Sequence, residues 1–595
     1  MNSGHLYGSS LLANPAIDGF VGTYSYSPNT RNLSMPLLPA GEYSSLWKKG
    51  KLWIIEDDTR THLCPSNQVY GGFPLKWCQN LGDTLSILRR NYLTASMLSH
   101  GSYLFDLEAQ GWFGQAQDPA TAMAIWQTMG DAVKAVAQVD VESGPLPSHQ
   151  VAVFFDEVSA ATQPLDSRLL DVHNASSRTI SGDYSMHNSS LELSGIGASF
   201  KHYYLTDLPT LDVSSLRFVV FLNAFAPSED MRSSIKKAFA GSNTTLLFLG
   251  PAGIIKLVND TSCTADGGRV STFTGIDGLR MLAGAPQPAH TTIEPAAAAS
   301  ALFPGLSDLR GTKFGQPEPV APRFYMQAPA ESSTVHVLGV YAGSNVGASA
   351  GLPSLVSAEL PAGYRSIFSG ASALPATLLR VFAQAAGVHS YADCSQHHDC
   401  TVYAAGNALL IHAGSRSGAR TITLPQPLLV EDETGVTICR QPCLKFEAAL
   451  NATQSRLFYV RKAIRSLSRD EIRFKTDDFN RRVSTISTMP TVGTIVVHCA
   501  DKSNCTGEIQ AALDTDGATD IVVPLQGDTP LQVDPLFVRK GNRSLTFAPR
   551  VELLAISMSP AYQRIDASLL SIMSVENVIV VATGAVLRMR KLQYL

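Results

Sequence analysis

Residues 51–62 read KLWIIEDDTRTH, and they join a short apolar run to a dense cluster of charge. The apolar run is Leu52–Ile55, and three carboxylates, an arginine and a histidine follow within seven residues. Surface loops carry charge, but they seldom place so many ionisable groups at the tip of a hydrophobic strand. In α/β barrels the catalytic groups lie at the carboxyl ends of the strands. The stretch therefore predicts a barrel strand that ends in a functional site.

Short strands and helical spacing alternate through residues 1–125. Apolar runs at 17–26, 51–55 and 102–108 are predicted strands, and residues 84–99 have apolar side chains at helical spacing. Strand, helix and strand in this order are typical of parallel β/α units. Because eight such units close a barrel in about 250 residues, this segment is expected to form part of a (β/α)8 barrel.

The sequence pattern of residues 126–595 predicts three further domains and a linker. Residues 126–340 are expected to form an open α/β sheet of the flavodoxin-like or Rossmann-like kind, without the G-x-G-x-x-G of a dinucleotide site. Residues 341–462 have the short strands and turns of a small β-sandwich, and the polar residues 463–490 are a predicted linker. Residues 491–595 carry brief apolar runs between tight turns, which indicates the start of a right-handed parallel β-helix. The predicted fold class is multidomain α/β plus β.

Composition excludes several classes of function. The net charge of −4 gives no basic surface for nucleic acid, and no apolar run reaches the roughly 18 residues of a membrane span. The cysteines lack Cys-x2-Cys spacing with clustered histidines, so no metal site is expected. No cofactor is expected either.

Two features are typical of secreted proteins. Glycosylation acceptors of the Asn-x-Ser/Thr type occur eight times, and eight of the nine cysteines form close pairs: 64/78, 394/400, 439/443 and 499/505. A Ser/Thr-rich chain also yields such acceptors by chance, and that alternative stays open. The first twenty residues lack a basic region followed by an apolar core, so we expect an extracellular protein whose signal peptide is missing from this chain.

The motifs resemble a known family. GKLWIIEDDTRTH, followed by HGSYLFDLEAQGWF, resembles the last barrel strands of family-42 glycoside hydrolases, which include β-galactosidases. VAVFFDEVS, LRFVVFLNAF and LLFLGPAG resemble the β-galactosidase trimerisation domain, which implies a possible homotrimer. TITLPQPLLVEDETG resembles the small C-terminal β-domain of these enzymes, and SLLSIMSVENVIVVATGAVLRMRK resembles pectin-lyase-like β-helices.

This resemblance implies a retaining mechanism, in which two carboxyl groups lie about 5–5.5 Å apart. Glu56 matches the nucleophile at the end of the seventh barrel strand. The acid/base glutamate of the family lies on the fourth strand, which has no counterpart here, so the chain is expected to be an internal piece that lacks half of the barrel. A barrel-rim ion pair between Glu56 and Arg60 is the structural alternative.

Six further residues are candidates for binding the sugar or supporting Glu56. They are drawn from the ends of the three predicted strands and from the turn that follows: Tyr26, Asp58, Arg60, Asp106, Glu108 and Trp112. A tyrosine in the position of Tyr26 often hydrogen-bonds the nucleophile in such enzymes, and Trp112 would stack on a sugar ring. A packing or structural role is the alternative for each of them.

The leading hypothesis is therefore a carbohydrate-active protein that hydrolyses a terminal β-galactoside or related glycoside once the barrel is complete. One alternative is a non-catalytic, oligomeric carbohydrate-binding or cell-wall protein. Another is that the β-helix is a polysaccharide-degrading module of the pectin-lyase kind. In each case the expected partner is a carbohydrate.

Overall fold

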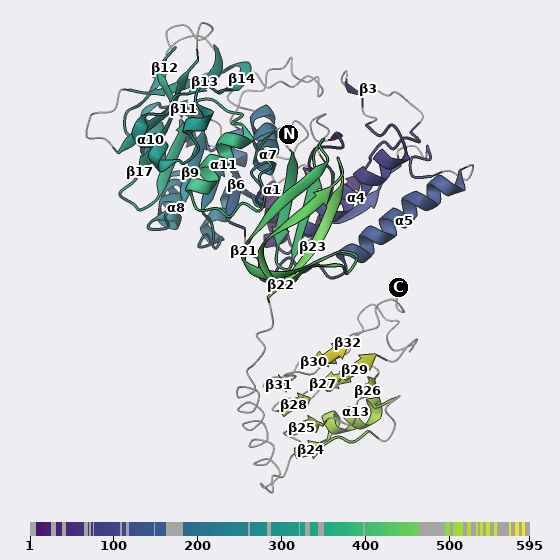
Figure 1. Ribbon diagram of the computed structural model, residues 1–595. Coiled ribbons are helices and arrows are strands. Elements are labelled where there is room, and N and C mark those ends of the chain that lie inside the picture. The colour runs from purple at the N-terminus through teal and green to yellow at the C-terminus, as the bar shows by residue number, and fades with distance from the viewer. Residues whose placement is uncertain are drawn as a thin grey trace. The chain divides into compact units, whose positions relative to one another are not determined.

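The computed structural model separates into two compact units, residues 1–464 and 465–595, and each is described by itself (Figure 1). The structure describes residues 8–24, 31–38, 43–64, 69–70, 73–74, 77–106, 110–114, 118–147, 149–161, 183–259, 262–282, 287–320, 322–327, 334–342, 350–396, 399–462, 494–499, 504–515, 520–524, 531–533, 536–538, 543–547, 552–555, 570–572, 578–581 and 586–588.

A three-stranded parallel sheet opens the first unit, in the order β1-β2-β5. Its strands are β1 (Gly19–Thr23), β2 (Leu52–Asp57) and β5 (Gly101–Leu104), accompanied by helices α1 (Gly8–Ala13), α3 (Tyr43–Lys48), α4 (Leu81–Met97) and α5 (Pro119–Val136). Helix α4 begins where the Asn80 side chain accepts a hydrogen bond from the Asp83 amide at 2.9 Å. Ile55 packs with Tyr24 and Ala95, so α4 covers one face of the sheet.

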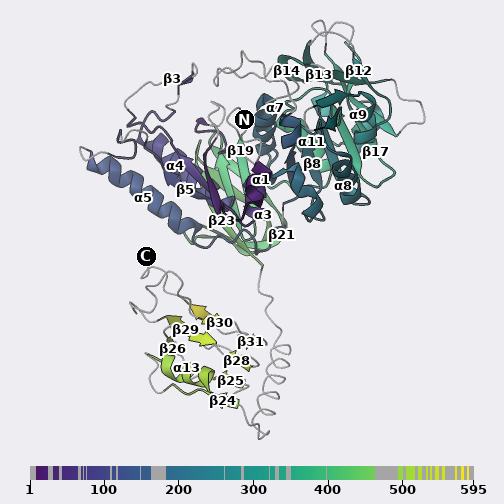
Figure 2. The same ribbon diagram turned by 180° about the vertical axis from the view of Figure 1, so that it is seen from behind.

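The opposite face of this sheet is open. Val21 is 57% exposed, Leu52 is 62% exposed and Tyr103 is 39% exposed. By strand alternation and register these three side chains share a face, because Thr23, Glu56 and Tyr103 are lateral neighbours. Helix α5 also exposes apolar side chains, at Met123, Trp126 and Val133, whose spacing places them on one side of the helix. Figure 2 shows α4 beside β5 and α5 beside α4.

A nine-stranded mixed sheet follows in the first unit. Its parallel part has the order β7-β6-β8-β9-β18 and consists of β7 (Phe200–Tyr204), β6 (Val151–Phe155), β8 (Phe218–Phe221), β9 (Thr245–Leu249) and β18 (Arg365–Ser369). Antiparallel strands continue it: β17 (Pro353–Glu359), β16 (Val335–Tyr341), β13 (Gln287–Ile293) and β14 (Lys313–Val320). The predicted boundary at residue 340 therefore falls inside this sheet.

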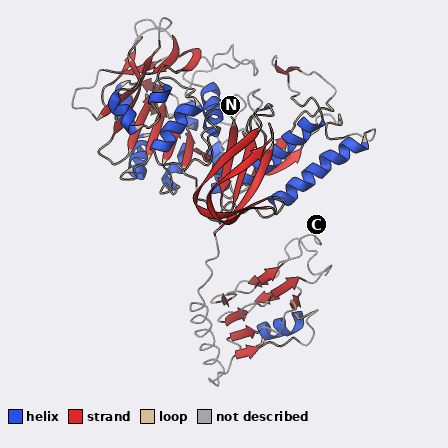
Figure 3. Cartoon of the chain, viewed as in Figure 1, coloured by secondary structure: helices blue, strands red, loops and turns tan. Residues whose placement is uncertain are grey.

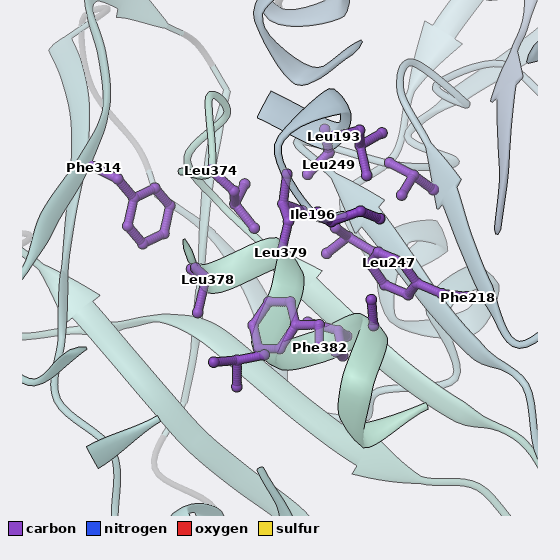
Figure 4. Packing of buried hydrophobic residues seen from close by; sticks show 14 of the residues in the cluster. Leu193, Ile196, Phe218, Leu247, Leu249, Phe314, Leu374, Leu378, Leu379 and Phe382 are labelled. Carbon is purple, nitrogen blue, oxygen red and sulfur yellow. The ribbon is translucent and has the colours of Figure 1, made fainter. Parts of the chain in front are cut away.

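Helices α7 (Asp183–Ser194), α8 (Glu229–Phe239) and α11 (Ala376–Ala385) accompany the sheet. Side chains from its strands and from α11 build one large core, in which Phe218, Leu247 and Phe382 are fully buried (Figure 4). The edge strand β7 is covered by α3, where Ser44 and Ser45 accept hydrogen bonds from its backbone amides at 3.2 and 2.7 Å. This cover protects an edge that would otherwise pair with other chains.

A five-stranded antiparallel sheet completes the first unit, in the order β19-β20-β23-β21-β22. Its strands are β19 (Cys400–Ala405), β20 (Ala408–Ala413), β21 (Gly418–Asp432), β22 (Thr437–Leu450) and β23 (Ser455–Arg461). They form one sheet in place of the two expected for a sandwich. The physical reason is that helices cover one face, since Leu93 of α4 and Ala132 of α5 pack in one cluster with Leu410 and Leu457.

The second unit consists of short parallel strands and one described helix, α13 (Thr506–Asp514) (Figure 3). One sheet has the order β24-β25-β28-β31, with β24 (Thr494–Val496), β25 (Asp520–Val523), β28 (Arg543–Phe547) and β31 (Val578–Val581). A second has β26 (Leu531–Val533), β29 (Glu552–Ala555) and β32 (Val586–Arg588), and a third pairs β27 (Leu536–Val538) with β30 (Leu570–Ile572). From β25 onward the chain visits the three sheets in turn and then repeats the order.

Three disulfide bonds join close cysteines: Cys394–Cys400, Cys439–Cys443 and Cys499–Cys505. The structure forms no such bond between Cys64 and Cys78, which are buried in the cluster that also holds Trp112. Burial raises the pKa of the Cys78 thiol to about 12, so this thiol stays protonated and unreactive at neutral pH.

Candidate functional site

Three parallel strands bring the candidate site together. The carboxyl ends of β1, β2 and β5 lie side by side, with Thr23 opposite Glu56 and Glu56 opposite Tyr103. Neighbouring residues of parallel strands point to the same face, so Glu56 shares the open face of the sheet. Its side chain is partly exposed, whereas Ile55 and Asp57 on either side of it are buried on the helix-covered face.

Glu56 accepts a hydrogen bond from a tyrosine. The Tyr103 hydroxyl donates to the Glu56 carboxylate at 2.5 Å, and this bond raises the pKa of Tyr103 to about 12. The tyrosine therefore stays protonated and continues to donate at neutral and moderately alkaline pH. A carboxylate that is fixed on one side and exposed on the other can attack an electrophilic carbon that approaches across the open face.

The residue after Glu56 has a structural role. Asp57 is buried and accepts hydrogen bonds from the Thr59 hydroxyl at 2.5 Å and from the Asn91 amide at 3.0 Å. Burial raises the pKa of Asp57, and these hydrogen bonds partly oppose that shift. Thr59 also bonds to the Tyr24 hydroxyl at 2.7 Å, so the side chains of Tyr24, just after β1, and of Asn91 on α4 hold the loop that follows β2.

Asp58 forms a buried ion pair with Arg31. Their nearest atoms, Arg31 Nη1 and Asp58 Oδ1, are 2.7 Å apart, and the two side chains are 5% and 8% exposed. The Arg31 guanidinium also lies 3.7 Å from the centroid of the Tyr24 ring. These contacts occupy Asp58 within the protein, and its predicted contact with sugar stays a prediction.

Arg90 supports the same region from helix α4. It is fully buried and donates hydrogen bonds to the Asn32 and Met35 carbonyls at 2.8 and 2.7 Å and to the Asn91 side chain at 2.8 Å. Burial lowers the pKa of Arg90. Asn91 in turn donates to Asp57, so one continuous hydrogen-bond network links α4 to the loop beside Glu56.

Arg60 and Trp112 pack together. The Arg60 guanidinium lies 5.3 Å from the Trp112 ring centroid, and its Nη1 atom is buried without a hydrogen-bond partner. Among the described residues no ion pair joins Arg60 to Glu56. Trp112 is fully buried, which leaves neither face of its ring open to a sugar, so we leave it out of the candidate site.

Asp106 organises the turn after β5. Its carboxylate accepts hydrogen bonds from the backbone amides of Gln110, Gly111 and Trp112 at 2.9, 2.7 and 3.0 Å. These bonds fix the turn and account for the position of Trp112. Tyr26 and Glu108, the other two candidates, lie outside the described residues, and their roles stay predictions.

Within the described ranges, no group of three or more His, Cys, Asp or Glu side chains is placed to hold a metal ion. In the same part of the chain, every helix is too short or too polar to cross a membrane.

Sequence reasoning missed four residues of this region. Tyr103 donates to Glu56, Arg31 pairs with Asp58, and Thr59 and Asn91 donate to Asp57, but none of the four was among the candidates. Only strand register brings Tyr103 to Glu56, and the spacing of the residues carries no signal of that register.

No protein-family model matches the chain, and no curated protein matches it. The chain is similar to several solved structures. One is the beta-galactosidase from Bacillus circulans sp. alkalophilus, with 13% identity, coverage of 71% of this chain and 62% of that one, and a TM-score of 0.48. Another is the beta-galactosidase from Rahnella sp. R3, with 13% identity, 75% and 60% coverage and a TM-score of 0.43.

An alpha-L-fucosidase, isoenzyme 2 from Paenibacillus thiaminolyticus, is similar at 12% identity, with 71% and 62% coverage and a TM-score of 0.41. The chain spans less than two thirds of the length of each of these three proteins. Since every TM-score is below 0.5, the function of this chain is inferred from its own side chains.

Proposed function

We propose that this chain is a carbohydrate-active protein of the retaining glycoside hydrolase type, with Glu56 as the nucleophile. The observation that carries the proposal is the placement of Glu56. It is the carboxylate at the end of a parallel strand that faces the open side of the sheet, and it accepts a hydrogen bond from Tyr103. The adjacent carboxylates of Asp57 and Asp58 are buried and engaged by other side chains.

In the proposed reaction, a Glu56 carboxylate oxygen attacks the anomeric carbon while the bond to the leaving oxygen breaks. The leaving group departs with the electron pair and takes a proton from an acid, and water then hydrolyses the glycosyl ester. The Tyr103 hydrogen bond orients the carboxylate and holds one of its oxygens. We further propose a terminal β-galactoside as the substrate.

The described residues do not supply the acid. Near Glu56, Asp58 is bound to Arg31, and Asp106 is held by three backbone amides. We therefore propose that further β/α units complete the barrel and carry the acid/base. The exposed Val21, Leu52 and Tyr103 support this, because side chains on that face would be buried inside a closed barrel.

A mechanism-based label tests the nucleophile without needing the acid. In a 2-deoxy-2-fluoro-β-galactoside with a dinitrophenolate leaving group, the leaving group departs without protonation, and the fluorine slows hydrolysis of the ester. We expect the wild-type chain to gain one sugar on the peptide that contains Glu56, as measured by mass spectrometry. Glu56→Gln should take up no label, and Tyr103→Phe should label more slowly.

Glu359→Gln is the matched control, because Glu359 is an exposed carboxylate that pairs with Arg365 in the nine-stranded sheet. This variant should label as the wild type does. A label on a residue other than Glu56, or equal labelling of the wild type and Glu56→Gln, would refute the nucleophile role.

A second candidate is non-catalytic carbohydrate binding. The observation that favours it is the lack of a carboxylate placed to act as the acid beside Glu56 in the described part of the chain. Glycan binding without turnover or labelling would support this candidate. Turnover that rises on addition of azide or formate, which substitute for a missing acid/base residue, would support the hydrolase instead.

Other parts of the chain carry proposals of their own. We propose that residues 126–340 belong to a trimerisation-type α/β domain and that the chain forms a homotrimer. The repeated visits of residues 520–588 to three parallel sheets support a proposed β-helix that could itself degrade polysaccharides. We also propose secretion and N-glycosylation, for which the exposed acceptors Asn243, Asn451 and Asn504 are available.

A further inference from the structure

A cavity of about 260 Å³ lies within the first unit, away from Glu56. Its wall comes from helix α3, the end of α4, residues 141–147 with His149, strand β7 and the turn between β19 and β20. Two helices, strands of two sheets and the residues that precede β6 thus meet at one concave site. Cavities at such junctions are common ligand sites, and this one suits a ligand smaller than a typical drug molecule.

A lysine without an ion pair lines this cavity. Lys201 on β7 is partly buried, and no described carboxylate lies within 4 Å of its ammonium group. Its Nζ atom lies 4.8 Å from the centroid of the Trp47 ring. Burial lowers the pKa of Lys201, and the more distant Glu142 carboxylate opposes part of that shift. A partly desolvated ammonium in this setting is stabilised by an anion that enters the cavity.

The neighbouring polar and aromatic groups suit a sugar. Burial lowers the pKa of His149 to about 3, so its ring is neutral and offers one donor and one acceptor. Trp47 is 43% exposed and supplies an aromatic surface, and the Tyr43 ring also lines the wall. Glu142 is exposed at the rim, where it can accept from hydroxyl groups.

Hydrogen bonds from the Asn407 side chain and from the backbone preform the rim of the cavity. Asn407 accepts from the Asp140 amide at 2.8 Å and donates its side chain to the Gln138 carbonyl at 2.8 Å. The Leu146 amide donates to the Gly406 carbonyl at 3.0 Å. Gly406 has φ +55°, and a side chain there would collide with the Asp140 carbonyl. A rigid rim lowers the entropy lost when a ligand binds.

We propose that this cavity binds a uronic acid unit, with the sugar carboxylate at Lys201 and the ring against Trp47. The monosaccharide size follows from the volume, and the carboxylate follows from the ammonium that lacks an ion pair. The site is separate from Glu56, and its occupation does not depend on the hydrolase proposal.

Isothermal titration calorimetry of the full chain with glucuronate and glucose tests the proposal, because the two sugars differ only in the carboxylate. We expect glucuronate to bind at least about tenfold more tightly than glucose. Lys201→Met should remove that preference, Lys201→Arg should retain it, and Trp47→Leu should weaken binding of both sugars. Lys236→Met, at an exposed lysine of α8, is the matched control and should change nothing.

Several outcomes would overturn the proposal. Equal binding of glucuronate and glucose would show that the Lys201 ammonium does not recognise the carboxylate. Absence of binding by both sugars would show that the cavity is not a sugar site. Acetate that binds as tightly as glucuronate removes the sugar assignment. If the thermal melt shows that Lys201→Met does not fold, binding by Lys201→Arg and Trp47→Leu tests the proposal instead. Loss of the preference for glucuronate in Lys201→Arg would contradict the proposed ion pair between residue 201 and the sugar carboxylate.

Discussion

Breaking the buried ion pair between Arg31 and Asp58 should destabilise the region around Glu56. The two groups are 2.7 Å apart with side chains 5% and 8% exposed, so each charge depends on the other. Removing one partner of such a pair costs about 3–5 kcal/mol, because the remaining charge stays buried alone. Asp58→Asn preserves shape and is expected at the lower end of that range.

Arg31→Met should cost about 1 kcal/mol more, because it also removes the guanidinium from the Tyr24 ring, whose centroid lies 3.7 Å away. It further removes a hydrogen bond to the Tyr24 carbonyl at 3.1 Å. In the double variant neither charge is left unpaired. Its loss of stability should therefore be smaller than the sum of the single losses by about 2–3 kcal/mol.

Urea unfolding followed by tryptophan fluorescence is a suitable assay. All five tryptophans of the chain lie between residues 47 and 126, so the signal reports the three-stranded sheet, its helices and their contacts with β6 and β7. Local reporting matters because a multidomain chain does not unfold in a single two-state step. Single variants that each lose less than about 1 kcal/mol, or losses that add in the double variant, would refute the reasoning, since such values are typical of an exposed pair.

Further predictions concern titration, acid stability and glycosylation. The phenolate absorbance of Tyr103 should appear with a pKa near 12, and Glu56→Gln should bring it towards the usual value of about 10; an unchanged pKa would contradict the hydrogen bond. His100 has buried ring nitrogens without partners, and burial lowers its pKa to about 3. Below the unfolded pKa of about 6.5 the histidine takes up a proton only in the unfolded chain, so the free energy of unfolding falls as the pH falls, by about 2 kcal/mol at pH 5. In the fluorescence assay, His100→Phe should not show this fall. In a secreting eukaryotic host, Asn451→Gln should reduce the mass by one glycan, and an unchanged mass would show that this acceptor is unused.

Part of the fold could be predicted because local pattern decides it. The apolar runs before Glu56 and Asp156 have the length and continuity of buried parallel strands, and the structure places β2 and β6 there. Strands β13 and β14 contain Pro288, Pro317 and Pro319, and proline weakens any prediction of a strand. Proline is tolerated in β14 because that strand lies at the edge of the sheet, where one side makes no ladder bonds. Pro288 precedes the part of β13 that pairs with β16, which is Thr291–Ile293.

The candidate site could be predicted only in outline. Alternation shows that Glu56 and Asp57 point to opposite faces, but it does not show which face helix α4 covers. The contact with Tyr103 depends on the register of β2 against β5, and the pairing of Asp58 with Arg31 spans 27 residues without any periodic pattern. Trp112 was expected to stack on a sugar ring, but the Asp106 turn directs its ring into the core.

The exposed apolar faces of the three-stranded sheet and of α5 link the stability of this chain to its surroundings. A molecule that covers Val21, Leu52 or Trp126 binds only the folded chain, because the unfolded chain does not present these side chains as one surface. By mass action, such a cover at one hundred times its dissociation constant adds about 2.7 kcal/mol to the free energy of unfolding. A melting temperature measured at one concentration therefore describes a mixture of folding and association, and dilution of the protein should separate the two.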